Sequence, residues 1–296
     1  MNKQIFKLLR PHQWLKNLFV FVPLFFDRHA TDWHYVWPCF LGFLAFCLVA
    51  SGIYCFNDIF DAESDRNHPT KCQRPIACNS VNTQTAFATM IIAWITAFIL
   101  IACTNFEERE MRQTVTETLL CYIVMNIAYC IKLKQIAILD VFVISTGFVL
   151  RIVVGSLITG IIFSHWIILI TFLLALFLAL SKRRDDVIIF KTTGIKTRKN
   201  VENYSMDFLN LSISFLGSIV IMCYILYTVS EDVMERMGNR NLYATSIFVL
   251  AGILRYMQIT FVDQKSGSPT SVLSSDLFIQ LCITCWIVAF VIILYL

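Results

Sequence analysis

The sequence predicts an all-α integral membrane protein, with nine transmembrane helices in a single bundle and a polar site that faces the cytoplasm. Three observations lead to this fold class. Of the 296 residues, 57% are hydrophobic and only 15% are charged, whereas about a quarter of a soluble domain is charged. Apolar runs of about 20 residues recur along the chain, which is the length that a helix needs to cross a bilayer. Lysine and arginine are also distributed unevenly between the intervening loops.

Nine apolar segments are predicted to cross the membrane as helices, because runs of this length are too long for the strands of a barrel. The first segment is the weakest, since Pro23 breaks it and Asp27 and Arg28 interrupt it. No intervening stretch is long enough for a soluble domain, so residues 1–296 are predicted to form one polytopic membrane domain. The segments are 14–32, 36–56, 84–103, 116–132, 136–160, 164–181, 208–230, 242–262 and 273–295.

The basic residues predict the orientation of these segments. The N-terminus and the loops after the even-numbered segments carry 17 Lys and Arg, whereas the opposite side carries five. Cytoplasmic loops are enriched in these residues, so the N-terminus and the polar site are predicted to lie on the cytoplasmic side of the inner membrane. The same asymmetry accounts for the net charge of +4. No nucleic-acid-binding motif is visible, and no nucleic-acid partner is expected.

Three aspartates follow the second segment in the stretch "NDIFDAESD", residues 57–65. If residues 51–65 form one helix, Asp58, Asp61 and Asp65 fall within an arc of about 60°. Like charges in this arrangement repel each other, and the helix dipole disfavours anions at a C-terminus. A compensating cation is therefore expected, and carboxylate oxygens suit Mg²⁺. The alternative is a solvated acidic helix end.

A basic stretch, "RNHPTKCQRPIA" at residues 66–77, directly follows the aspartates. It carries Arg66, Lys71 and Arg74, and its prolines stiffen the loop. Carboxylates that bind a metal beside fixed cations form a typical diphosphate site, because the metal bridges the oxygens and the cations neutralise the remaining charge. The alternative is the ordinary enrichment of cytoplasmic loops in basic residues.

Two further polar clusters are predicted on the same side. The stretch "SKRRDD", residues 181–186, carries Lys182, Arg183 and Arg184 before two aspartates, and indicates either a second phosphate or metal half-site or a stop-transfer cluster. The stretch "RPHQWLKN", residues 10–17, indicates either an interfacial anchor or a phosphate-binding face, since α-helical spacing would place Arg10, Gln13 and Asn17 together.

Two charged residues lie inside the fifth segment. Asp140 and Arg151 are eleven residues apart, about three helical turns, and are predicted to point the same way into the bundle. Whether they are structural or line a cavity stays open, as does the role of Arg255 in the eighth segment. Nothing in the sequence resembles a Ser-His-Asp or Cys-His nucleophilic arrangement.

The motifs together resemble the UbiA-type membrane prenyltransferases. "NDIFDAESD" fits their NDxxDxxxD pattern, and "RPHQWLKN", "LDVFVISTGFVLR", "LALSKRRDD" and "GSPTSVLSSD" are similar to the decaprenyl-phosphate phosphoribosyltransferase branch. The resemblance runs from Arg10 to about Asp276. That branch transfers phosphoribose from 5-phosphoribosyl 1-diphosphate to a polyprenyl phosphate in the membrane and releases pyrophosphate. The resemblance implies the same Mg²⁺-dependent reaction here.

The resemblance also implies residue roles. The metal and diphosphate would be taken by Asn57, Asp58, Asp61 and Asp65, with Asp58 and Asp61 catalytic. The donor's phosphates would be held by Arg66, Lys71, Arg74, Lys182, Arg183 and Arg184. From their location, Arg10, Lys16, Asn17 and Lys134 are further candidates for substrate binding, and the lipid phosphate is the group that Arg10, Lys16 and Lys134 would position. The family often has a glutamate near position 186, where this sequence has Asp185 and Asp186, so the role of these two residues stays open.

Two competing functions are retained. A prenyltransferase with an aromatic acceptor, such as 4-hydroxybenzoate, would use the same aspartates. A transporter would use Asp140 and Arg151 as pathway residues, although transporter sites are expected near the membrane midplane rather than at one face.

Overall fold

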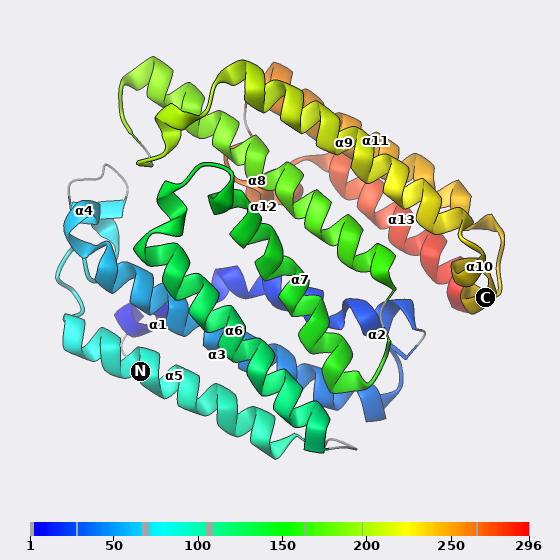
Figure 1. The fold of residues 1–296 in the computed structure, drawn as a ribbon, viewed down its shortest axis with the longest axis horizontal. Coiled ribbons are helices and arrows are strands. Elements are labelled where there is room, and N and C mark those ends of the chain that lie inside the picture. Colours follow the sequence, from blue (N-terminus) through cyan, green and yellow to red (C-terminus); the bar gives the residue numbers. More distant parts are fainter. Residues whose placement is uncertain are drawn as a thin grey trace. The chain divides into compact units, whose positions relative to one another are not determined.

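A computed structural model describes residues 3–27, 29–66, 71–104, 109–162, 164–196, 198–264 and 266–295. Helices and short connections make up this part of the chain, and it contains no β-strand (Figure 1). The predicted all-α class is confirmed. The chain divides into two compact units, the first comprising Met1–Lys134 with Gly147–Phe163, and the second comprising Gln135–Thr146 with Ser164–Leu296.

The first unit is built around α3 (Trp33–Phe60), which packs along α5 (Thr83–Cys103) (Figure 1). The two helices approach closely because Gly52 has no side chain, and a Cβ there would lie 2.2 Å from the indole nitrogen of Trp94. The remaining elements that lie wholly in this unit are α1 (Lys3–Leu9), η1 (Pro11–Phe21), α2 (Val22–Phe26), α4 (Ala62–Arg66), η2 (Lys71–Gln73) and α6 (Arg109–Ile131).

Two elements belong partly to each unit. The short η3 (Leu133–Gln135) contains the first boundary, and α7 (Leu139–Thr159) contains the second, between Thr146 and Gly147. The residues of α7 before this second boundary pack in the second unit, where Val141 joins the core. The later residues pack in the first unit, where Val154 joins the core.

The second unit is built on α8 (His165–Thr193), which packs against α9 (Met206–Val229). Its core contains Phe177, Leu209 and Tyr256. A second helix pair, α11 (Ser246–Gln258) and α13 (Leu277–Tyr295), completes it (Figure 1). The connecting elements are η4 (Val201–Asn203), α10 (Glu231–Met237), η5 (Asn241–Thr245), the π-helix η6 (Ile259–Asp263) and α12 (Pro269–Ser275).

The predicted first span differs from a single long α-helix. Residues 14–26 of this span lie in the 3₁₀-helix η1 and the five-residue α2, and each element has a proline in its first turn. Side chains three residues apart eclipse in a 3₁₀-helix, so Trp14, Asn17 and Val20 share a face. The prediction that Gln13 and Asn17 share an α-helical face is therefore wrong, because the helix type differs.

The inward face of η1 packs tightly against α7. Asn17 and Val20 are buried. The carbonyl oxygen of Val20 is so near Gly155 that a Cβ on this glycine would lie 1.9 Å from it. The glycine is therefore required for the close approach of these two elements.

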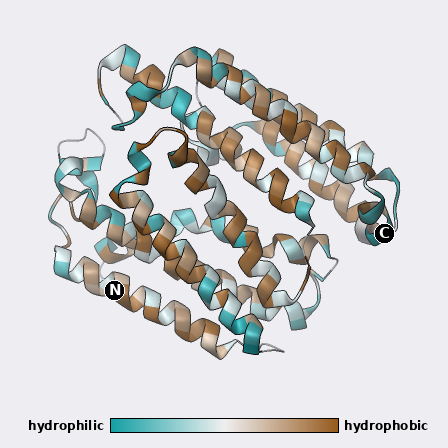
Figure 2. Ribbon diagram, in the orientation of Figure 1, coloured by the Kyte–Doolittle hydropathy of each residue, from teal (hydrophilic) through white to brown (hydrophobic). Residues whose placement is uncertain are grey.

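Seven helices in the described part of the chain are long and apolar enough to cross a membrane. An eighth crossing is present if α12 and α13, which meet at 84°, count as one broken span. Apolar residues extend along most of these helices, as Figure 2 shows. Large aliphatic side chains such as Leu211 and Leu277 are 73% and 78% exposed, which is favourable only where lipid surrounds them. The chain is an integral membrane protein, and the nine-helix count stays a prediction.

Candidate functional site

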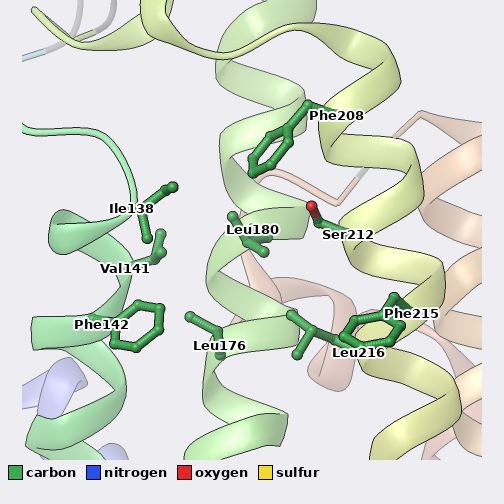
Figure 3. A pocket seen from close by; sticks show the side chains of 9 residues that line it. All are labelled: Ile138, Val141, Phe142, Leu176, Leu180, Phe208, Ser212, Phe215 and Leu216. Carbon is green, nitrogen blue, oxygen red and sulfur yellow. The ribbon is translucent and has the colours of Figure 1, made fainter.

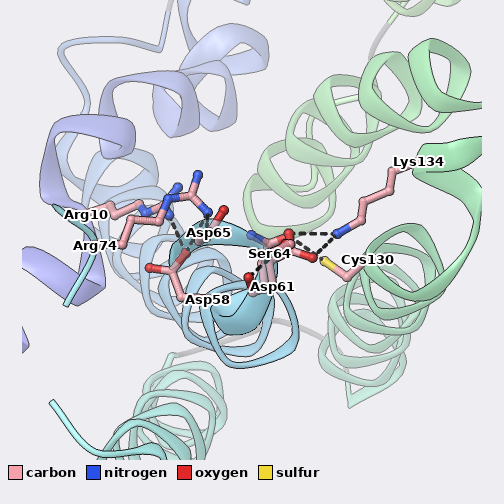
Figure 4. A network of polar contacts seen from close by, with 9 residues as sticks. Arg10, Asp58, Asp61, Ser64, Asp65, Arg74, Cys130 and Lys134 are labelled. Atoms are coloured by element: carbon pink, nitrogen blue, oxygen red, sulfur yellow. Dashed lines mark hydrogen bonds and ion pairs between the residues drawn. The ribbon is translucent and has the colours of Figure 1, made fainter. Parts of the chain in front are cut away.

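The predicted acidic motif lies where α3 ends in the first unit. The helix ends at Phe60, Asp61 is its C-terminal cap with φ −92° and ψ 0°, and α4 begins at Ala62. The interruption at Asp61 separates the three carboxylates into two groups (Figure 4). Asp58 and Asp65 are buried and share one partner, whereas Asp61 pairs elsewhere. The single acidic face predicted from an unbroken helix is therefore only partly formed.

Two arginines neutralise the first group. Arg10 Nη2 lies 2.5 Å from Asp58 Oδ1. Arg74 Nη1 lies 3.2 Å from the same oxygen and 2.6 Å from Asp65 Oδ2, so one guanidinium nitrogen bridges both carboxylates. Arg10 occupies the turn between α1 and η1 with φ 51°, a conformation that is uncommon for residues other than glycine. Its guanidinium also lies 5.0 Å from the centre of the Tyr54 ring, which restricts its movement.

A lysine neutralises the remaining carboxylate. Lys134 Nζ donates to both oxygens of Asp61, at 2.6 Å and 2.8 Å. The ammonium also lies 5.4 Å from the centre of the Phe60 ring. Cys130, one helical turn earlier, donates from Sγ to Asn57 Oδ1 at 3.4 Å. Sequence reasoning selected Lys134 for its location but missed this pairing, because 73 residues separate it from Asp61.

One oxygen of this cluster has no partner. Asp58 is 1% exposed, and its Oδ2 accepts no hydrogen bond from any described residue. Buried carboxylate oxygens are rarely left unsatisfied, because the loss of hydration costs free energy. This oxygen and the bridging position of Arg74 between two carboxylates fit a site that accepts a further cation. No group of three or more metal-ligating side chains converges in the described part of the chain.

The other predicted basic residues of the first unit lie on three elements. Arg66, at the end of α4, donates from Nη2 to Asn79 Oδ1 at 3.2 Å. Lys71 begins η2, and Lys16 lies within η1. His68, within the same basic stretch, lies outside the described residues.

Asn17 belongs to a series of hydrogen bonds that connect η1 to α3 and α7. Trp14 Nε1 donates to Ser51 Oγ at 3.0 Å. Asn17 Nδ2 donates to Cys47 Sγ at 3.1 Å and its Oδ1 accepts from Arg151 Nε at 2.8 Å. These contacts hold the segment that follows Arg10 against α3.

Arg151 is buried without a carboxylate partner among the described residues. Its Nη1 donates to Gly147 O at 2.6 Å and its Nη2 to Tyr122 OH at 3.1 Å. The guanidinium also lies within 5.3 Å of the ring centres of Phe46, Tyr122 and Phe148. Neutral acceptors and aromatic faces therefore stabilise this charge, rather than Asp140.

The second predicted cluster lies within α8 in the second unit, because the helix continues past residues 181–186 and ends only at Thr193. Most of its charged side chains pair with other residues of the same unit. Arg183 is 1% exposed and donates from Nε to Asp140 Oδ2 at 2.6 Å and from Nη1 to Asp186 Oδ2 at 3.0 Å. Tyr204 OH donates to Asp140 Oδ1 at 2.7 Å and accepts from Ile138 N at 2.7 Å. Burial raises the pKa of Tyr204, and the neighbouring Asp140 carboxylate raises it further.

Arg184 and Asp185 are also held internally. Arg184 donates to Asn210 Oδ1 at 2.8 Å and to Thr260 O in the π-helix η6 at 2.6 Å. Asp185 Oδ1 accepts from Ser266 Oγ at 2.8 Å. Its other oxygen is so close to Gly267 that a Cβ there would lie 2.9 Å from it. The stretch "GSPTSVLSSD" therefore begins where the chain closes over Asp185. Lys182 lies directly before the buried Arg183.

An apolar pocket of about 190 Å³ lies in the second unit, between the start of α7 and helices α8 and α9 (Figure 3). A cavity of about 150 Å³ with an aliphatic and aromatic lining holds benzene, so this pocket suits a short length of hydrocarbon. Ser212 contributes the only polar side chain to the lining, which is completed by Ile138, Val141, Phe142, Leu176, Leu180, Phe208, Phe215 and Leu216.

Comparison with known proteins gives matches over nearly the whole chain. Residues 19–197 match the UbiA prenyltransferase family. The decaprenyl-phosphate phosphoribosyltransferase of Mycolicibacterium smegmatis is 31% identical, with 96% of this chain and 90% of that protein aligned. The enzyme of the same name from Corynebacterium glutamicum is also 31% identical, with coverages of 98% and 86%. A UbiA homologue from Archaeoglobus fulgidus, solved with GPP and Mg²⁺, superposes with a TM-score of 0.70 at 18% identity, covering 99% and 100% of the two chains.

Proposed function

Because the chain belongs to the UbiA prenyltransferase family, we propose that it transfers 5-phosphoribose from 5-phosphoribosyl 1-diphosphate to a polyprenyl phosphate and releases pyrophosphate. Two relatives that are 31% identical over nearly their full length carry the name decaprenyl-phosphate phosphoribosyltransferase. The family resemblance predicted from the motifs is thereby confirmed.

The observation that carries the proposal is the paired cluster at the end of α3. Three aspartates and three cations, Arg10, Arg74 and Lys134, lie there together. A donor diphosphate with its metal needs anionic oxygens for the metal and cations for the phosphates. The unsatisfied Asp58 Oδ2 supports a metal site within this cluster.

Asp58, Asp65 and Asp61, with Asn57 beside them, would hold Mg²⁺. When bound, this ion would neutralise charge on the leaving diphosphate as a Lewis acid. Arg10, Arg74 and Lys134 would turn from the carboxylates to the phosphate oxygens and stabilise the departing pyrophosphate. Arg66 and Lys71 lie on the same loop or beside it and would take the outer phosphate.

The bond changes require little of the chain's own acids and bases. The bond from the anomeric carbon to the diphosphate breaks with its electron pair on the diphosphate, and an oxygen of the lipid phosphate forms the new bond to the same carbon. The lipid phosphate is already anionic, so no general base is needed. The roles of these residues are therefore to hold two phosphorylated substrates and to exclude water.

A transfer assay tests this function. Purified protein in lipid nanodiscs would receive Mg²⁺, polyprenyl phosphate and donor labelled in the ribose. Label in the lipid fraction with an equal amount of pyrophosphate is expected. Prenylation of 4-hydroxybenzoate from a polyprenyl diphosphate, without label in lipid, would establish the aromatic-acceptor alternative instead. Transport of the donor across sealed vesicles without turnover would establish the transporter.

We further propose nine crossings with the cluster on the cytoplasmic side. A 3₁₀-helix rises about 2.0 Å per residue and an α-helix about 1.5 Å, so η1 and α2 together extend about 30 Å, the thickness of the hydrocarbon core. The excess of 17 basic residues over five supports the orientation.

Two native cysteines test this orientation. Cys78 is exposed beside the basic loop, and the Ser80 hydroxyl lowers the pKa of its thiol. Cys103 is exposed at the other end of α5. A membrane-impermeant maleimide is expected to label Cys78 in inside-out vesicles and Cys103 in right-side-out vesicles. The reverse pattern would contradict the orientation.

A further inference from the structure

All three carboxylates of the α3 cluster are already neutralised by cations of the same unit. We propose that Arg10, Arg74 and Lys134 mask the aspartates from free Mg²⁺, so that the ion and the donor diphosphate bind together far more tightly than either binds alone. This inference rests on the proposed function and concerns how that site selects its ligands.

To reach the aspartate carboxylates, free Mg²⁺ would have to displace the cations that are paired with them. Arg74 Nη1 lies between Asp58 and Asp65, at 3.2 Å and 2.6 Å, and Lys134 contacts both oxygens of Asp61. The displaced cations cannot move far away. Arg10 is restricted by Tyr54 at 5.0 Å and by its left-handed backbone turn, and Lys134 by Phe60 at 5.4 Å. They would remain close to a doubly charged ion, and charges at such distances repel strongly.

The donor diphosphate alone meets the opposite obstacle. Its phosphates would attract the three cations, and the movement of those cations would leave the aspartates unpaired. Asp58 and Asp65 are 1% and 3% exposed, so water cannot replace the lost partners, and an unpaired buried carboxylate is costly.

The two ligands together remove both obstacles. The carboxylates of the cluster, including Asp58 whose Oδ2 has no partner in the described structure, would hold the metal, and the cations would turn to the phosphates. Every charge then has a partner of opposite sign. Coupling between two ligands is commonly about 5-fold to 150-fold, and a cluster in which three ion pairs exchange partners is expected to lie in the upper part of this range.

Replacement of Lys134 is the most direct test of whether the cations mask the aspartates. It contacts a single carboxylate, and its side chain is 19% exposed, so its replacement leaves the pairs of Asp58 and Asp65 unchanged. In Lys134→Met, Asp61 is unmasked. Mg²⁺ alone should therefore bind more tightly than to the wild type, while the donor in the presence of Mg²⁺ should bind more weakly.

A matched variant controls for the change in overall charge. Lys196 pairs with Glu202 at 2.9 Å in the second unit, and both side chains are more than half exposed. Lys196→Met removes the same charge from an ion pair far along the chain. It should bind all ligands as the wild type does.

Titration calorimetry on the full-length protein in detergent tests the proposal with three titrants: MgCl₂ alone, phosphoribosyl diphosphate with EDTA, and phosphoribosyl diphosphate with saturating Mg²⁺. The wild type is expected to bind the third at least about tenfold more tightly than either of the others. Lys134→Met is expected to bind MgCl₂ several-fold more tightly than the wild type.

Two results would overturn the inference while leaving the proposed function intact: wild-type affinity for Mg²⁺ that does not depend on the donor, or weaker binding of Mg²⁺ by Lys134→Met. Failure of all three titrants to bind would remove the proposed function and this inference together. If Lys134→Met is not recovered as a folded protein, Lys134→Gln, which removes the charge but keeps a polar side chain beside the partly exposed Asp61, should show the same gain for Mg²⁺ alone.

Discussion

The chain combines aspartates with basic residues at the end of one membrane helix, α3, and within another, α8, and the two clusters differ in how they are buried. At the end of α3, the side chains of Arg10, Arg74 and Lys134 are about a fifth to a quarter exposed. Within α8, the side chain of Arg183 is 2% exposed, and that of its partner Asp140 on α7 is 0% exposed. The first cluster can exchange its cations for a ligand, whereas the second is closed within the packing of its unit.

The difference shows that a stretch of carboxylates next to Lys and Arg is not by itself evidence of a phosphate-binding site. Both stretches have carboxylates next to Lys and Arg, but Asp140 on α7 and Tyr204 after η4 enclose Arg183 from the side. The Arg183 side chain is 2% exposed and pairs with Asp140 and Asp186, so a phosphate cannot readily reach it, although its Nη2 has no partner among the described residues. We therefore propose that Arg183 positions helices rather than binds the donor, and the variants below test this division.

Removal of the buried cation should have the largest effect on stability. Arg183→Met leaves Asp140 buried with Tyr204 as its remaining partner, and loss of one member of a buried pair costs about 3–5 kcal/mol. Unfolding by SDS in mixed micelles would measure the free-energy change. The double variant Arg183→Met/Asp140→Leu should recover much of the loss. Normal stability with weaker donor binding in Arg183→Met would instead support the phosphate role predicted from the sequence.

Removal of the carboxylates of the first cluster should affect turnover and leave the fold intact. Asp58→Ala and Asp61→Ala are expected to lower the transfer rate by about 10²-fold to 10³-fold, the range for loss of a group that stabilises charge in the transition state. The labelled-donor assay measures the rate, and gel filtration checks that each variant folds. Full activity in both variants would rule out the metal role.

A smaller effect is expected for the hydroxyl that supports Asp140. Tyr204→Phe removes its donor to Asp140 and the acceptor for Ile138 N, at a cost of about 1–3 kcal/mol. The raised pKa of Tyr204 also gives a pH signature. Its contribution is complete below about pH 10, where an exposed tyrosine titrates, and falls as the pH rises towards the folded pKa.

The unfolding free energies of the wild type and of Tyr204→Phe are measured from neutral pH to about pH 11, just beyond the usual tyrosine pKa. The difference between them at each pH is the contribution of the Tyr204 hydroxyl. The difference in stability between them should shrink at the alkaline end. A difference that stays constant or grows with pH would contradict the assigned hydrogen bond.

The exposed pair Lys196–Glu202 should contribute least. Both side chains are more than half exposed, and such pairs contribute about 0–1 kcal/mol. Lys196→Met should therefore change the unfolding free energy by less than about 1 kcal/mol and leave turnover unchanged. A loss comparable to that of Arg183→Met would contradict the view that burial separates the two clusters.

Several features of the fold were predictable from local patterns. The helices α3, α5 and α9 were predictable from the length and composition of their apolar segments alone, because a chain that crosses lipid must form a continuous hydrogen-bonded helix. The first segment was not predictable in this way. Its prolines and its contact with Gly155 favour a 3₁₀-helix, and that contact joins residues far apart in the sequence.

The partners of the site residues were likewise beyond local pattern. Asp61 and Lys134 are 73 residues apart, and Arg10 and Asp58 are 48 apart. Asp140 and Arg151 have suitable spacing on one helix, yet each has its own partners on other elements. Helical periodicity predicts in which direction a side chain points from its helix axis. It does not predict which other helix lies in that direction.

By itself, the sequence determined that this protein is an all-helical membrane protein with a carboxylate motif after its second apolar segment, because hydrophobic length and residue spacing act locally along the chain. The tertiary structure alone decided which charges are buried pairs and which are accessible. Ion-pair strength and exchange depend on burial and on partners from other elements, and packing sets both.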